Sequence, residues 1–279
     1  MSCYKFIYDD NYADFLIDYN YDINEIYRRY NPECVNILSN KYAVIYKNIN
    51  ESGVFDNDRF SFNVIGYDSF PKLYTVLDNG VEFNNKDKVE FLQLNGDEEE
   101  NQLYNSFIDR ILTESGISQL RRFEGFDITG RDVLIGFIDT GINYSLDIFK
   151  FEDGGSKISA IWDQSIMEGI NGFEGENLDF SNSMEIQDDK TFFGYGRVYD
   201  NNEINQAINV ENPLDIVKSV DSNGHGTSLA SLASSIATDA NLVIVKLKEA
   251  KNSLKNFYGI NESTLCYAES DIMAGGFFF

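Results

Sequence analysis

The stretch VLIGFIDTG at residues 133–141 decides the fold class of this chain. A nearly continuous apolar run leads into Asp139, Thr140 and Gly141, a pattern typical of a strand that is buried on both faces and then turns. Strands of this kind belong to parallel sheets that are covered by helices. The pattern therefore predicts a buried parallel strand that ends at Asp139.

Two segments further along the chain fit the same sheet. GHGTSLASLASSIA at 224–237 has the spacing of a helix lined with small residues, and NLVIVKLK at 241–248 is a second apolar run. In the long excursion before them, Asp200 and Glu203 have the spacing of a capping box at the start of another helix. The order strand, excursion, helix and strand predicts an α/β fold.

The first part of the chain has a different pattern. Residues 3–9 and 42–48 are short β-prone runs, and DINEIYRRYN at 22–31 reads as an amphipathic helix with Ile23, Ile26 and Tyr27 on one face. This predicts a small α+β unit over residues 1–80. Residues 81–105 are more polar and include the acidic run DEEEN, which predicts a linker or exposed insertion, and 106–116 has helical spacing.

The composition excludes several classes of function. Acidic residues number 46 and basic residues 22, and the resulting net charge of -24 is spread over the whole length, so phosphate backbones and anionic membranes would repel the chain. The start, MSCYKFIYDDNY, lacks the basic and apolar regions of a signal peptide, and no apolar stretch is long enough to span a bilayer. We expect a chain made in the cytoplasm that binds no nucleic acid and does not insert into a membrane.

The cysteines do not indicate a metal site. Cys3, Cys34 and Cys266 are an odd number with wide spacing, which fits neither a disulfide framework nor a zinc site, and we interpret them as reduced structural thiols. No G-x-G-x-x-G or P-loop string occurs, which disfavours a nucleotide-binding α/β protein. We expect no metal and no cofactor.

Asp139 lies where a catalytic carboxylate could act. In open α/β sheets, ligands bind at the carboxyl ends of the strands, and Asp139 closes the predicted strand. Taken alone the signal is weak, because an Asp before a Gly-containing turn is more often a turn former.

His225 is the single histidine of the chain and lies where the helix at 224–237 should begin. A lone histidine is more often a solvent-exposed or structurally satisfied residue. Here glycines on both sides allow close packing, while Leu229, Leu232 and the alanines should bury the helix behind it. A rigid base on a buried helix suits acyl-transfer chemistry.

The strings IGFIDTGI at 135–142 and SNGHGTSLAS at 222–231, in this order, resemble the acid and base motifs of the subtilisin family of serine proteases. The resemblance implies that Asp139 orients the imidazole and that His225 takes a proton from a serine hydroxyl and returns it to the leaving amine. It also implies an α/β fold, an incomplete subtilisin-like doubly wound parallel sheet preceded by a small α+β prodomain. Asp139 and His225 should face each other at the carboxyl edge of that sheet.

Longer strings are similar to the clostridial germination-specific Csp branch of that family: KISAIWDQSI, YDNNEINQAI, NPLDIVKSVDSNGHGT and ATDANLVIVKLK. The resemblance implies a spore-associated serine endopeptidase that cleaves a protein or peptide, with a cortex hydrolase zymogen as the expected substrate. Residues 106–275 would be the N-terminal part of the catalytic domain. By position and pattern, residues 1–80 would be the prodomain. In that family the prodomain assists the folding of its own catalytic domain and inhibits it, so the prodomain is an expected binding partner.

The nucleophile motif of that family, a G-T-S before small residues and a Pro, has no counterpart after the base here. The G-T-S string at 226–228 belongs to the base motif, and Ser228 follows His225 by three residues on the same predicted helix. Its hydroxyl therefore cannot lie in line with the imidazole across a substrate cleft. We expect the chain as given to be inactive.

The last residues suggest truncation. AESDIMAG at 268–275 begins like a helix with Ser270 as N-cap, and the GGFFF that ends the chain combines two glycines with three phenylalanines that have no evident partner. We interpret 276–279 as a non-native tail, and a genuine short protein with an adhesive end is the alternative.

Two further expectations follow from the resemblance. The Csp branch includes pseudoproteases, so a non-catalytic regulator remains a second functional class, although intact Asp139 and His225 argue against a long-standing loss of catalysis. In well-known subtilisins a loop after the base helix holds a calcium ion, but here SLASS leads directly into IATDANLVIVKLK. This compressed passage predicts no tight calcium site beside the base helix.

Overall fold

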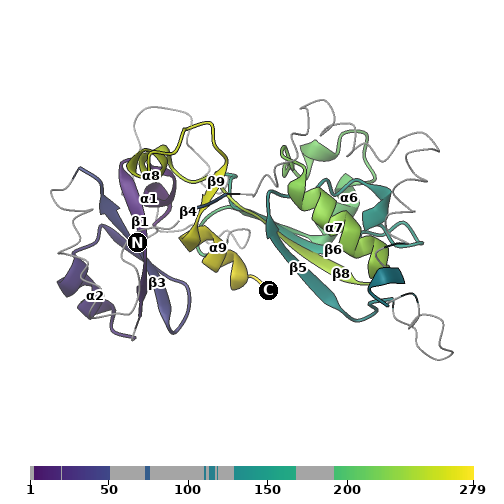
Figure 1. Cartoon of the computed structure of the whole chain (residues 1–279), viewed down its shortest axis with the longest axis horizontal. Helices are drawn as coiled ribbons and strands as arrows, with labels where there is room; N and C mark the ends of the chain where they lie inside the picture. The colour runs from purple at the N-terminus through teal and green to yellow at the C-terminus, as the bar shows by residue number, and fades with distance from the viewer. Residues whose placement is uncertain are drawn as a thin grey trace. The chain divides into compact units, whose positions relative to one another are not determined.

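A computed structural model describes residues 3–19, 21–50, 73–75, 129–167 and 192–279, together with 110, 113–116 and 118. The structure is mixed α/β, with parallel and antiparallel strand pairs (Figure 1). It divides into two compact units, one made of Met1–Leu77, Asp163–Val198 and Leu247–Phe279, the other of Asp78–Trp162 and Tyr199–Lys246. The predicted linker at 81–105 lies outside the described residues and the predicted helix at 106–116 lies mostly outside them.

The unit with the candidate site is built on a sheet to which the described residues contribute four strands, in the order β5-β8-β6-β7. β5 and β8 pair in parallel, with Asp139 opposite Lys246. Helix α7 lies against one face of this sheet (Figure 1). The elements are β5 (Leu134–Asp139), β6 (Ile158–Asp163), β7 (Arg197–Asp200), α6 (Asn201–Ala207), α7 (His225–Ile236) and β8 (Asn241–Lys246), with 3-10 turns η1 (Asp147–Phe149) and η3 (Pro213–Asp215). The predicted strands and the predicted helix at 224–237 are therefore confirmed.

The two apolar strands differ in burial. β8 is buried through its middle, whereas Val133 and Leu134 beside and within β5 are 47% and 54% exposed. The prediction that residues 133–139 are buried on both faces is wrong, because β5 lies at the edge of the sheet formed by the described strands. An apolar run indicates that a strand prefers to be buried, but it does not show whether other elements of the fold cover that strand.

The predicted capping box at the start of α6 is confirmed. The Asp200 carboxylate accepts a hydrogen bond from the Glu203 amide at 2.9 Å, and the Glu203 carboxylate accepts one from the Asp200 amide at 3.0 Å. The side chain of Asn201 donates to the carbonyls of Ser156 and Ile158, which anchors the helix start to β6. The capping box could be predicted from the sequence because both of its residues lie within one helical turn.

The other unit contains an antiparallel sheet of the order β1-β3-β2 and an antiparallel pair of β4 with β9. Its core gathers Phe15, Ile17, Ile45 and their neighbours, with Ile26 and Leu254 packed against them. The elements are α1 (Tyr4–Tyr8), β1 (Tyr12–Asp18), α2 (Ile23–Tyr30), β2 (Cys34–Ile37), β3 (Tyr42–Asn48), β4 (Leu73–Thr75), α8 (Asn252–Phe257), β9 (Cys266–Ala268) and α9 (Glu269–Gly276). None of the described helices is long and apolar enough to cross a membrane.

Several predictions for this unit need correction. The β-prone run at 3–9 forms helix α1, and the strands β1 and β2 were missed. The predicted helix and the strand at 42–48 are confirmed as α2 and β3, although in α2 only Ile26 is buried, while Ile23 and Tyr27 remain exposed. The run at 3–9 is too short for its own preference to outweigh tertiary contacts.

The interpretation of all three cysteines as reduced thiols is wrong. The sulfurs of Cys3 and Cys34 form a disulfide, whereas Cys266 is free and buried. The bridge joins the residue before α1 to the first residue of β2. Sequence spacing could not reveal this pair, because it depends on where two distant segments pack.

The end of the chain also differs from expectation. Helix α9 begins two residues earlier than predicted, with Ala268 rather than Ser270 at the N-cap. Phe278 is not without a partner, since its ring meets that of Phe192 edge-on at 5.1 Å between centroids. Asp271 in α9 is only 3% exposed, so this helix is a packed part of its unit.

A buried ion pair connects the first and last segments of this unit. Lys251 donates from Nζ to the Asp14 carboxylate at 2.5 Å, and both side chains are at most 3% exposed. The same ammonium donates to the carbonyls of Phe6 and Tyr12 at 2.6 and 3.0 Å. Burial lowers the pKa of Lys251, and the nearby Asp14 carboxylate opposes that shift. Three acceptors around one buried ammonium make its removal costly.

We expect Lys251→Met to lower the free energy of unfolding by about 3–5 kcal/mol, because it leaves the Asp14 carboxylate buried without its partner. Adding Asp14→Leu should restore part of this loss, with the carbonyls of Phe6 and Tyr12 still unpaired. Urea unfolding followed by circular dichroism measures the effect. The matched control is Lys150→Met, which removes an exposed ion pair with Asp147 and should cost less than about 1 kcal/mol. Equal losses in the two single variants would contradict the prediction.

Candidate active site

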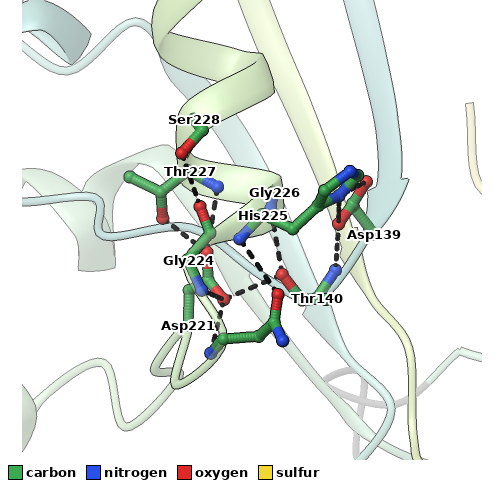
Figure 2. Close-up of polar contacts among 9 residues, drawn as sticks. Asp139, Thr140, Asp221, Gly224, His225, Gly226, Thr227 and Ser228 are labelled. Atoms are coloured by element: carbon green, nitrogen blue, oxygen red, sulfur yellow. Dashed lines mark hydrogen bonds and ion pairs between the residues drawn. The ribbon is translucent and has the colours of Figure 1, made fainter. Parts of the chain in front are cut away.

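The structure brings Asp139 and His225 together. Nδ1 of His225 lies 2.8 and 2.9 Å from the two carboxylate oxygens of Asp139 (Figure 2). A carboxylate only accepts hydrogen bonds, so this arrangement places the ring proton on Nδ1 and leaves the lone pair on Nε2. The Asp139 side chain is 12% exposed and that of His225 is 40% exposed. The ring is therefore anchored on one side and accessible on the other.

Asp139 owes its position to the end of β5. The strand stops at Asp139, and the Thr140 amide donates to Oδ1 of Asp139 at 2.7 Å, which turns the chain around the carboxylate. Gly141 follows with a φ of +123°, and a Cβ there would lie 3.1 Å from the Lys246 side chain on the neighbouring strand. The carboxylate thus lies at the carboxyl end of a parallel strand, the usual place for chemistry in such sheets.

His225 is the first residue of α7, and Gly226 allows this helix to start against the strand end. A Cβ at Gly226 would lie 2.3 Å from the Gly141 carbonyl oxygen, closer than any real contact. Gly224 before the histidine has a φ of +86°, in the left-handed region that favours glycine. The predicted close packing is therefore confirmed at Gly226, whereas Gly224 provides the left-handed backbone turn.

The helix behind His225 is buried through its small residues. Gly226, Thr227, Ala230, Ser231 and Ser234 are buried, whereas Leu229 is 42% exposed. The expectation that Leu229 helps to bury the helix is wrong. Small side chains let α7 lie close to the sheet, whereas the larger Leu229 side chain lies on the exposed side of the helix.

Sequence reasoning missed the polar residues that hold the helix start. Gly224, the N-cap of α7, makes no side-chain cap. Instead, Asp221, Asn223 and Thr140 accept hydrogen bonds from the first amides of the helix. Asp and Asn shortly before a helix are a known capping signal, which could have pointed to Asp221 and Asn223. The part played by Thr140 comes from the strand end and is visible only in three dimensions.

Ser228 does not act as a partner for the imidazole. Its hydroxyl donates to the Gly224 carbonyl at 2.8 Å, within its own helix. Within the described part of the chain, the only hydrogen-bond contacts of the His225 ring are those to Asp139. The site therefore presents an oriented imidazole whose Nε2 has no hydrogen-bonded hydroxyl among the described residues.

Similarity to known proteins is limited. No family model and no curated protein matches this chain. A solved structure of the Clostridium perfringens CspB protease matches with 29% sequence identity and a TM-score of 0.32. The match covers 47% of this chain and 24% of that one, so the chain spans only about a quarter of the length of that protein. A TM-score of this size does not establish a shared fold.

The passage between α7 and β8 leads to a prediction about calcium. Four residues, 237–240, separate the two elements, and their one carboxylate, Asp239, pairs with Arg131 at 3.3 Å. Calcium needs about six to eight oxygen ligands around one point, which this turn cannot supply. We expect calcium added to the metal-stripped protein to leave its unfolding temperature unchanged apart from a small screening effect.

Thermal unfolding over a calcium titration tests this, with magnesium at equal ionic strength as the control. A saturable stabilisation at micromolar calcium that is abolished by changes within 233–241 would show that a site exists there.

Proposed function

We propose that this chain is the N-terminal portion of a subtilisin-like serine endopeptidase, with Asp139 as the orienting acid and His225 as the general base. The observation that carries the proposal is the contact of Nδ1 of His225 with both oxygens of Asp139 at the carboxyl end of β5. The order of the two motifs along the chain, acid before base, supports it. The paired geometry is what acyl transfer by a serine requires of these two residues.

The chemistry follows from the state of the ring. Nε2 of His225 would accept the proton of a serine hydroxyl as that oxygen attacks a peptide carbonyl, and would then return it to the leaving amine. Asp139 would hold the ring in the Nδ1–H tautomer and stabilise the imidazolium that forms. The side chain of His225 is 40% exposed, which is compatible with the approach of a nucleophile and a substrate to the ring. The nucleophile itself would come from sequence beyond the motifs present here.

The biological role is proposed from the resemblance to the Csp branch. The substrate would be another spore protein, and the zymogen of a cortex-degrading hydrolase would be activated by the cleavage. By motif order, residues 1–80 would act as the prodomain, residues 106–275 as the N-terminal part of the catalytic domain, and 276–279 as a non-native tail. This division differs from that of the compact units, in which 247–279 packs with 1–77. The spore would be its location.

A non-catalytic regulator is the second candidate. It is favoured by one observation, the lack of a hydroxyl partner for His225 among the described residues. A pseudoprotease could retain the acid and base as structural residues after losing its serine. The two candidates differ in whether a nucleophile belongs to the same gene.

Genomic DNA beyond codon 275, read in all three frames, decides between the candidates. For the protease we expect a Gly-Thr-Ser string followed by small and apolar residues and a proline. A protein extended to include that string should react with a fluorophosphonate probe, and His225→Ala should reduce this reaction by about 10⁴-fold. The absence of any downstream motif would favour the regulator.

The chain of 279 residues should itself be inert. Without a serine aligned with Nε2, His225 has no proton to abstract, and the loss of one triad member typically costs several orders of magnitude in rate. We expect no labelling by the fluorophosphonate probe and no self-cleavage between residues 80 and 106, measured by mass spectrometry of the purified protein. Labelling of an intact sample that disappears in Ser228→Ala would show that Ser228 is a nucleophile after all.

A further inference from the structure

We propose that Asp221 is a positioning residue that holds His225 against Asp139 by connecting the end of β5 to the start of α7. The proposal rests on the proposed function in one respect, namely that the pair being positioned is a catalytic acid and base. The contacts themselves and their test are independent of any protease activity.

The Asp221 carboxylate is surrounded by hydrogen-bond donors. Oδ1 accepts from the Gly224 amide at 2.8 Å, from the Thr140 hydroxyl at 2.8 Å and from the Asn223 amide at 3.2 Å. Oδ2 accepts from the amide and the hydroxyl of Thr227 at 2.9 and 2.6 Å. Every partner donates, so only an acceptor with two charged or strongly polar oxygens satisfies all of them.

One oxygen of Asp221 contacts the neighbours of both site residues. Thr140 directly follows Asp139, and Gly224 directly precedes His225. Oδ1 of Asp221 therefore fixes the strand end and the helix start at positions one residue away from each member of the pair (Figure 2). A displacement of either segment would have to break a hydrogen bond to this oxygen.

The hydroxyls of Thr140 and Thr227 also link the end of β5 to the start of α7, one from each side. Thr140, on the strand side, accepts from the Gly226 amide of the helix at 2.9 Å. Thr227, on the helix side, accepts from the Asn143 amide, which follows the strand, also at 2.9 Å. Each hydroxyl then uses its single proton to donate to Asp221. The carboxylate thus sets the direction of both hydroxyls and, through them, the spacing between strand and helix.

The charge of Asp221 suits this location. The first amides of a helix carry a partial positive charge and lack partners within the helix, and Asp221 supplies acceptors to two of them, in Gly224 and Thr227. An asparagine of the same shape would present an NH₂ group to donors on one side and lose the charge. The connection should therefore depend on the carboxylate itself and not only on the volume of the side chain.

The test uses the single histidine of the chain, whose ring nitrogens give unambiguous NMR signals. In the whole chain, ¹⁵N and ¹H spectra of the neutral ring should show the Nδ1–H tautomer and a downfield Nδ1–H proton. In Asp221→Asn we expect the ratio of the Nδ1–H to the Nε2–H tautomer to fall on the order of tenfold, the scale of one misplaced hydrogen-bonding group, with the downfield proton lost. Asp139→Asn serves as the positive control for a broken pair.

Matched variants separate positioning from a general loss of stability. Tyr144→Phe removes a buried hydrogen bond to the Val217 carbonyl in the same unit but touches neither Asp221 nor the pair, so its His225 spectrum should match that of the unchanged protein. Thr140→Val removes the bridging hydroxyl and should shift the tautomer ratio in the same direction as Asp221→Asn. Thr140→Ser keeps the hydroxyl and should preserve the spectrum.

A folded Asp221→Asn protein with an unchanged tautomer ratio would overturn the proposal. If that variant does not fold, the Thr140 pair decides: equal spectra for the Val and Ser variants would overturn it, and a shift in the Val variant alone would support it. None of these spectra requires a nucleophile or a substrate. A missing downstream serine would therefore refute the protease while leaving this result intact, and an unchanged spectrum would refute the positioning role while leaving the protease intact.

Discussion

The candidate site depends on one close contact, between the start of α7 and the end of β5. A Cβ at Gly226 would lie 2.3 Å from the Gly141 carbonyl oxygen and 3.1 Å from Cβ of Asp139, so any other residue would force the helix away. Because the backbones meet directly, the short imidazole side chain reaches the carboxylate at hydrogen-bond distance. The contact between Asp139 and His225 therefore depends on the absence of a side chain at residue 226.

This contact brings two carboxylates to the positive end of one helix. Asp221, with Asn223 and Thr140, satisfies the first amides of α7. Since those amides already have acceptors, they do not compete for the Asp139 carboxylate, which remains available to the imidazole. Asp221 thus binds the helix amides while Asp139 binds the imidazole, and this separation leaves Asp139 free to orient the ring of His225.

The second unit follows a different principle. Its hydrophobic core is supplemented by buried ion pairs. Lys251 with Asp14 joins residues from opposite ends of the chain, and Lys248 with Asp271 ties α9 to the segment that follows β8. Such pairs add little net stability over apolar residues, but an unpaired member is costly, so they select one arrangement of the segments. The last helix is consequently held by its charge partners as well as by apolar packing.

Local signals along the chain were sufficient to predict several elements: the strands β3, β5 and β8, the helices α2 and α7 and the capping box at Asp200 and Glu203. The resemblance of two short motifs to a known family also predicted that Asp139 and His225 would face each other, and their side chains are in contact. Three features became visible only in the folded chain: β5 lies at the edge of the described strands with Leu134 exposed, Cys3 pairs with Cys34, and Asp221 and Thr140 bind the helix start. Each of these depends on which distant segments become neighbours, and periodicity and spacing within one segment carry no information about that.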